Sequence, residues 1–204
     1  MIMKLLISSN NRDKIKEIRS IFQLPNVELV TLESIPNAPE VVEDGNTLYE
    51  NALKKASMLY EFSGLPTISD DTGLEVDALN GRPGVYSARF AGENATYDDN
   101  VEKMIREMQS VSIKNRTARF RTVAVFYHPD LLIHEEGVIE GTILSEKRGI
   151  GGFGYDPIFY VPGKKKTLAE LSHDEKNAIS HRSQAFSRLY KSLLKQLPSI
   201  TDIN

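Results

Sequence analysis

The sequence of 204 residues contains no cysteine, which excludes a disulfide framework, a thiol nucleophile and thiolate metal sites. It also lacks a strong excess of either charge, because 25 basic and 28 acidic residues give a net charge of −3. A broad attraction to nucleic acid is therefore not expected, and any anion must be bound by a local basic cluster. No apolar run approaches the length of a membrane-spanning helix. These absences predict a cytoplasmic protein with neither a nucleic-acid nor a membrane partner.

Repeats, low-complexity tracts and obvious linkers are also missing, and the four histidines are too scattered to form a zinc site. Hydrophobic residues make up 40% of the chain, which is enough for a buried core. The apolar start at residues 2–7 is followed at once by Ser8-Ser9-Asn10-Asn11, which favours a first buried strand over a signal peptide. We therefore expect one domain over residues 1–204.

Helical and strand patterns alternate along the chain. The first expected helix carries Ile15, Ile18 and Phe22, and Thr47-x-x-Glu50 reads as a capping box before a second helix that ends near Gly64. Two further helices are expected over 96–108 and 182–197. Expected strands cover residues 4–8, 27–32, 65–68, 74–78, 119–128, 131–144 and 158–161. This order predicts an α/β fold with a mixed sheet and not a strict βαβ series.

The most informative short segment is Ser69-Asp70-Asp71-Thr72-Gly73, which contains two adjacent carboxylates. Neighbouring acids at the end of a strand repel each other unless a cation is present, and carboxylate oxygens suit a magnesium ion that carries substrate phosphates. The alternative is a solvated turn. On these residues alone, the turn is the better interpretation.

Two further segments contain groups that suit a phosphate. Ser9 and Asn11 precede the first helix, whose N-terminus offers free N–H groups, and Lys14 lies one turn into it. On the second helix Asn51 and Lys55 are four residues apart and share a face, preceded by the acidic loop at Glu43. For the first segment alone, an ordinary helix cap is the better interpretation. For the second, exposed charges on an amphipathic helix explain the residues equally well.

A glycine-rich run, Gly149-Ile150-Gly151-Gly152-Phe153-Gly154, matches G-x-G-x-x-G formally, but a β-rich stretch follows it where a dinucleotide fingerprint needs a helix. We interpret it as a loop that lets a ligand approach closely, with Phe153 available to stack on a base. The donors of Lys176, His181 and Arg182 suit acceptor edges such as a purine O6. A plain turn and a helix start remain the alternatives.

Together these segments resemble the inosine triphosphate pyrophosphatase family, the noncanonical purine nucleoside triphosphate pyrophosphatases. The resemblance runs from about residue 5 to about residue 197, and its motifs keep the order and spacing of the family. They are Ser9-Asn10-Asn11-x-x-Lys14-x-x-Glu17, Glu50-Asn51-Ala52-x-x-Lys55-Ala56, Ser69 to Leu74, Gly81-x-Pro83 to Arg89, Gly151 to Phe159, and Glu175-Lys176-Asn177-x-x-Ser180-His181-Arg182.

The resemblance implies an elongated, two-lobed α/β fold with the substrate in a cleft between the lobes, and a Mg²⁺-dependent homodimer. It implies hydrolysis of ITP, dITP and XTP between the α and β phosphates, which yields the nucleoside monophosphate and pyrophosphate. Such an activity clears deaminated purines from the nucleotide pool.

The same resemblance implies roles for individual residues. Asp71 matches the proton acceptor and metal ligand, with Asp70 and, on a looser match, Glu43 as further metal ligands. Thr72 stands where the family often has a serine that contacts the substrate. The positions that match triphosphate-binding residues are Ser9, Asn11, Lys14 and Lys55. The positions that match base-binding residues are Phe153, Gly154, Tyr155, Asp156, Lys176, His181 and Arg182.

Other functions are weighed against this one. A regulator that senses a purine triphosphate without cleaving it would use the same lysines and Phe153, so only a turnover assay separates it from an enzyme. A metal-dependent nuclease acting through Asp70 and Asp71 would be expected to carry a basic stripe with interleaved aromatic residues, which the sequence lacks. A protein without a site would require every motif to be a coincidence.

Overall fold

The computed structural model describes residues 2–24 and 26–200, with side chains described as far as residue 196. The helices are α1 (Arg12–Ile21), α2 (Leu48–Ser63), α3 (Tyr97–Glu107), α4 (His173–Asn177) and α5 (His181–Ile200). The strands are β1 (Met3–Ile7), β2 (Val27–Thr31), β3 (Thr67–Val76), β4 (Pro83–Gly84), β5 (Thr117–His128), β6 (Leu131–Ile143), β7 (Phe159–Val161) and β8 (Lys166–Thr167).

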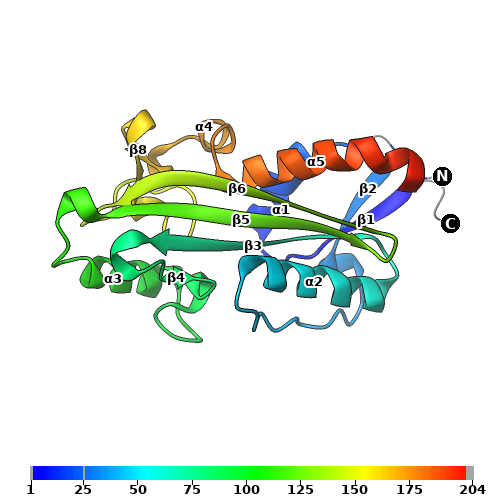
Figure 1. Ribbon diagram of the computed structural model, residues 1–204, viewed down its shortest axis with the longest axis horizontal. Coiled ribbons are helices and arrows are strands. Elements are labelled where there is room, and N and C mark those ends of the chain that lie inside the picture. Colours follow the sequence, from blue (N-terminus) through cyan, green and yellow to red (C-terminus); the bar gives the residue numbers. More distant parts are fainter. Residues whose placement is uncertain (1, 25, 201–204) are drawn as a thin grey trace. The chain divides into compact units, whose positions relative to one another are not determined.

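The strands follow the order β2-β1-β3-β5-β6-β7-β8, and β4 pairs with β3 (Figure 1). β1 is parallel to β2 and β3, whereas β3–β4, β6–β7 and β7–β8 are antiparallel. The predicted α/β fold with a mixed sheet is therefore confirmed. Among the helices of the described part of the chain, none is long and apolar enough to cross a membrane.

The chain forms two compact units, which are described separately. Unit 1 consists of Met1–Asp71, Thr122–Gly137 and Arg182–Asn204, and unit 2 consists of Thr72–Arg121 and Val138–His181. Each has a hydrophobic core of its own, and the boundaries fall within β3, β5 and β6 and at the start of α5.

Unit 1 has three layers, with α1 and α5 on one face of its strands and α2 on the other (Figure 1). Leu5, Ile68 and Phe126 from the strands pack with Ile18 of α1 and Phe186 of α5. The predicted apolar stripe of the last helix is confirmed, because Leu189 and Leu193 also belong to this core; the side chain of Leu197 lies outside the described residues. This layering sets which helix each β3 side chain can reach.

The helix ends follow their local sequence. Asn11 caps α1 by accepting hydrogen bonds from the N–H groups of Asp13 and Lys14, and Gly64 ends α2 with a left-handed φ of 68°. The predicted capping box of α2 is wrong in one detail. Thr47 does cap the helix, but the Glu50 carboxylate accepts from the N–H of Asn46 and not from that of Thr47.

The largest difference from expectation lies in β3. The sequence predicted two short strands separated by a solvated Asp-Asp-Thr-Gly turn, whereas one continuous strand runs from Thr67 to Val76. Asp70 and Asp71 lie inside this strand, and only 2% and 6% of their surfaces are exposed. The turn interpretation is therefore wrong, and both carboxylates are buried groups that need partners.

Candidate active site

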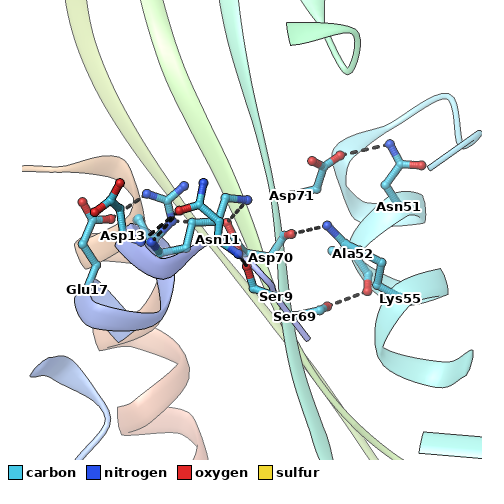
Figure 2. Close-up of polar contacts among 12 residues, drawn as sticks. Ser9, Asn11, Asp13, Glu17, Asn51, Ala52, Lys55, Ser69, Asp70 and Asp71 are labelled. Atoms are coloured by element: carbon cyan, nitrogen blue, oxygen red, sulfur yellow. Dashed lines mark hydrogen bonds and ion pairs between the residues drawn. The ribbon is translucent and has the colours of Figure 1, made fainter. Parts of the chain in front are cut away.

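The carboxylates of Asp70 and Asp71 point to opposite faces of β3, because successive side chains of a strand alternate. The Asp70 carboxylate faces α1 and α5, whereas the Asp71 carboxylate faces α2 (Figure 2). Adjacent acids in the sequence are therefore separated by the strand itself. This geometry removes much of the repulsion that the sequence alone suggested, before any cation is considered.

On the first face, Asp70 belongs to a buried network of four charges in unit 1. Its Oδ2 lies 3.2 Å from Lys14 Nζ and 3.2 Å from Arg182 Nε. The Arg182 guanidinium also donates to Glu17 Oε2 at 2.6 Å. The network holds two positive and two negative groups, so its formal charges balance, as buried charges require.

These neighbours explain why the pKa of Asp70 is shifted downward. Burial alone would raise the pKa of this carboxyl, but the charges of Lys14, Arg182 and Lys55 together hold it below its ordinary value. Burial lowers the pKa of Lys14, and the charge of Asp70 opposes that shift. Asp70 is therefore an anion that fixes cations in place.

On the opposite face, Asn51 anchors Asp71. Its Nδ2 donates to Asp71 Oδ2 at 3.0 Å, and its Oδ1 accepts from the N–H of Gly45 at 2.7 Å. The amide is fully buried, and a Cβ at Gly45 would lie 2.7 Å from Asn51 Oδ1. Asn51 thus fixes the Asp71 carboxylate and holds the backbone of the acidic loop close to α2.

Lys55 extends this second group. Its Nζ lies 2.5 Å from Glu43 Oε1 and 2.6 Å from the backbone oxygen of Asp70. Burial raises the pKa of Asp71, the charge of Lys55 opposes that shift, and the charge of Glu43 adds to it. A buried carboxyl with a raised pKa beside a lysine and a second carboxylate is typical of sites that handle a proton.

The predicted triphosphate residues thus lie in unit 1 with Asp71 and Glu43, and Ser9 accepts from the N–H of Asn11 at 3.1 Å at the start of α1. Thr72 is the next residue of β3, half-buried, and the first residue of unit 2. In the described part of the chain no three acidic or histidine side chains gather where they could hold a metal ion. Glu43 and Asp71 still provide the hard oxygen ligands that a magnesium ion takes, so a partial set of donors fits that ion.

Most of the predicted base-binding residues form a second group in unit 2. Asp156 Oδ2 accepts from Lys176 Nζ at 2.7 Å and from the N–H of Phe153 at 2.9 Å. The ammonium of Lys176 lies 4.7 Å from the centre of the Phe153 ring. Gly152 has a φ of 70°, and a Cβ there would lie 2.0 Å from Asp156 Oδ2. This turn therefore requires glycine at 152, and it presents a partly exposed aromatic ring beside a buried lysine.

Three predicted base-binding residues have partners that the sequence did not indicate. The hydroxyl of Tyr155 donates to the Ser87 carbonyl at 2.9 Å, and burial raises its pKa. The ring of His181 stacks on Phe120 at 4.8 Å. Arg182 belongs to unit 1, where it pairs with Asp70 and Glu17.

Sequence reasoning gave no role to Glu17 and did not connect Asn51 with Asp71. Glu17 follows Lys14 by three residues in the same motif and lies on the buried face of α1. A charged residue next to Ile18 on that face was the feature of the sequence that could have indicated its role. Asn51 was noted for sharing a face with Lys55. Its partner lies 20 residues away on β3, which local spacing does not reveal.

An α/β sheet with partly buried lysines and buried carboxylates beside the N-terminus of a helix is typical of proteins that bind phosphorylated ligands. The chain belongs to the Ham1 family, whose model matches residues 5–192. This membership confirms the family to which the sequence motifs pointed.

Named relatives resemble the chain over nearly its full length. A protein of Desulforamulus reducens named dITP/XTP pyrophosphatase is 48% identical over 91% of this chain and 93% of its own. One of Geobacter sulfurreducens with the same name is 47% identical over 91% of this chain and 94% of its own. Among solved structures, a HAM1 protein from Coxiella burnetii matches with a TM-score of 0.88 and 37% identity, covering 95% of this chain and 99% of that one.

Proposed function

We propose that the protein hydrolyses noncanonical purine nucleoside triphosphates (ITP, dITP and XTP) to the nucleoside monophosphate and pyrophosphate. This reaction would clear deaminated purines from the nucleotide pool. The observation that carries the proposal is the buried Asp71, fixed by Asn51 and flanked by Lys55 and Glu43, in a chain whose close relatives are named dITP/XTP pyrophosphatases.

The site residues of unit 1, and Thr72 next to Asp71 on β3, have proposed tasks. Ser9, Asn11 and Lys14 at the start of α1, together with Lys55, bind the triphosphate, and Thr72 contacts it as well. Asp71 orients the attacking water and accepts its proton. Asn51 supports this role because its hydrogen bond of 3.0 Å restricts the carboxylate. Lys14 and Lys55 are suited to stabilise the negative charge that develops on the leaving pyrophosphate.

A magnesium ion is the proposed cofactor, held by Glu43 and Asp71, because carboxylate oxygens are its preferred ligands. When bound, it would offset the charge of the triphosphate oxygens. Asp70 was predicted as a further ligand. Its carboxylate is already paired with Lys14 and Arg182, so the geometry favours Asp70 as the residue that places these cations.

The residues Phe153, Gly154, Tyr155, Asp156, Lys176, His181 and Arg182 are proposed to recognise the base. Inosine and xanthine present a 6-keto acceptor where adenine presents an amino donor. The ammonium of Lys176 donates a hydrogen bond to Asp156 Oδ2 at 2.7 Å, and as a group with donors only it suits such an acceptor. An adenine would leave these donors unpaired, which predicts discrimination against ATP.

The proposal includes two properties of the whole protein. A homodimer is supported by the family resemblance, and a cytoplasmic location is supported by the nucleotide pool on which the enzyme would act. Light scattering after gel filtration should then give about twice the chain mass of 22.9 kDa. A mass equal to one chain at micromolar concentration would contradict the dimer and leave the chemistry untouched.

Product analysis over a panel of nucleotides tests the function. ITP, dITP, XTP, GTP and ATP are each incubated with the enzyme, with Mg²⁺ or with EDTA, and pyrophosphate and orthophosphate are measured separately. We expect pyrophosphate from the first three with Mg²⁺, far slower turnover of ATP, and none with EDTA. Orthophosphate as the direct product, or equal turnover of ATP, would contradict the proposal.

A further inference from the structure

We propose that Tyr97 is a positioning residue for Phe153, acting through ring contact to hold the aromatic side chain that stacks on the base. This inference rests on the proposed base-binding role of Phe153. Both residues belong to unit 2, and their ring centres lie 6.0 Å apart with an angle of 37° between the ring planes.

The backbone around Phe153 is already fixed by other groups. The N–H of Gly151 donates to the Ala169 carbonyl at 3.0 Å, and the N–H of Phe153 donates to Asp156 at 2.9 Å. What remains to be set is the direction of the Phe153 ring about its side-chain torsions. The ring is only partly buried, so packing from the core of unit 2 does not enclose it.

Two neighbours fix that direction. The ammonium of Lys176 lies over the ring at 4.7 Å, and the centre of the Tyr97 ring lies 6.0 Å away, within the range of stabilising aromatic pairs. Lys176 is buried and bound to Asp156, so its position is set by the same turn that carries Phe153. Lys176 comes from α4 and Tyr97 comes from α3, so the ring is in contact with side chains of two helices.

The start of α3 is a rigid support for this purpose. Tyr97 is the first residue of the helix and lies within the capping box that Thr96 forms with Asp99. Lys147, at the other end of the glycine-rich loop, lies 2.5 Å from Asp98 and 2.7 Å from Glu102 of the same helix. The N-terminal half of α3 therefore contacts this segment at two points, Lys147 and Phe153.

The geometry excludes a sandwich of the base between the two rings. A base between two rings needs about 7–8 Å between their centres, because each contact takes about 3.5–4.0 Å. The observed 6.0 Å is too short. Tyr97 therefore acts on the base through Phe153.

Steady-state kinetics with ITP tests the role. We expect Tyr97→Ala to raise KM about five-fold and to change kcat less than about two-fold, because an aromatic pair of this kind corresponds to about two- to ten-fold in affinity. Tyr97→Phe keeps the ring and should match the wild type. Tyr86→Ala, a tyrosine of unit 2 with 55% exposure, is the matched control and should leave KM unchanged.

A binding measurement tests the same role without turnover. The chain has no tryptophan, so Tyr97→Trp places a single tryptophan against Phe153, and its emission can be excited selectively over that of the tyrosines. We expect inosine monophosphate to change its emission and inorganic pyrophosphate to leave it unchanged, and Tyr86→Trp should respond to neither. This variant also covers the case in which Tyr97→Ala does not fold.

The outcomes separate the two proposals. A wild-type protein that releases no pyrophosphate from ITP contradicts the proposed function. An active wild type whose Tyr97→Ala variant keeps the same KM overturns only the role of Tyr97. So does a Tyr97→Phe variant as impaired as Tyr97→Ala, because the hydroxyl would then be the important group.

Discussion

Asp71 and Asp70 differ in the groups that hold their carboxylates, and this difference predicts different consequences of mutation. Asp71 accepts one hydrogen bond from Asn51, whereas Asp70 is bound to two cations. Loss of charge at position 71 removes a proposed base but leaves an amide that can remain beside Asn51. Loss of charge at position 70 leaves buried cations without their counter-ion.

We therefore expect Asp71→Asn to abolish release of pyrophosphate from ITP while nucleotide binding remains measurable. Turnover is followed by pyrophosphate release and binding by calorimetry with inosine monophosphate. The unfolding temperature serves as the control and should stay close to that of the wild type. Undiminished turnover in this variant would remove Asp71 from the proposed chemistry.

The buried position of Glu17 predicts that loss of its charge lowers the stability of the fold. Glu17→Gln breaks one pair of the buried network, and the positive charges of Lys14 and Arg182 then exceed the remaining charge of Asp70. We expect the free energy of unfolding to fall by about 3–5 kcal/mol, the cost of an uncompensated buried charge. Urea denaturation measures it, and Glu61→Gln on the exposed face of α2 is the control. An equal, small change in both variants would show that the network contributes little.

Among the elements, α2 carries two residues of the unit 1 site, Asn51 and Lys55. Its two ends are set by Thr47 and by Gly64, whose N–H donates to the Tyr60 carbonyl at 2.7 Å. Gly64 has a φ of 68° and open space around its missing Cβ. Any effect of a methyl group there must come from backbone strain alone.

Gly64→Ala should therefore lower the free energy of unfolding by about 1 kcal/mol, because a residue with a Cβ resists the left-handed conformation. Thermal or urea denaturation measures the change. Gly163→Ala, also in open space but without a positive φ, is the matched control and should be close to neutral. A Gly64→Ala variant as stable as the wild type would indicate that the end of α2 adjusts its backbone.

The elements also show what local sequence predicts well. The helices α1, α2 and α3 follow from their caps at Asn11, Thr47 and Thr96 and from their apolar spacing. The continuous strand β3 does not, because Asp and Gly disfavour strands and the polar run hides the alternation. Helices packed on both faces supply the partners that make this strand stable. Tertiary context overrides local preference there.

In the proposed site, too, some features follow from the local sequence and others follow only from the fold. Lys14, Lys55 and Asp71 were predicted from motif order, and the structure places all three in unit 1. The pairing of Arg182 with Glu17 joins residues 165 positions apart, so no local pattern could indicate it. The contact of Tyr97 with Phe153 is equally remote from any motif, and only the fold brings it about.

For the molecule as a whole, the near balance of charge separates the proposed enzyme from a nuclease. With a net charge of −3, polyanions gain no general attraction, and phosphate binding depends on the few lysines at the site. A small triphosphate can use such a local cluster, whereas a polymer needs an extended basic surface.

We accordingly expect ITP to be cleaved and single-stranded DNA to remain intact under the same conditions with Mg²⁺. Denaturing gel electrophoresis follows the DNA while a pyrophosphate assay follows ITP in the same tube. Asp71→Asn serves as the control for contaminating nucleases, because any DNA cleavage that persists in it arises elsewhere. Cleavage of DNA faster than ITP, and lost in that variant, would favour the nuclease.

The alternation along β3 has a consequence for how the chain can vary. A deletion or insertion of one residue before Asp70 within the strand would exchange the surroundings of the two acids, sending the anchor of the cations toward α2 and the proposed base toward α1 and α5. Substitutions at the two positions should accordingly have different effects. Those at Asp70 should lower the amount of folded protein, and those at Asp71 should lower catalysis. Asp70 and Asp71, although adjacent in the sequence, would thus be under different selective pressures because they lie on opposite faces of one strand.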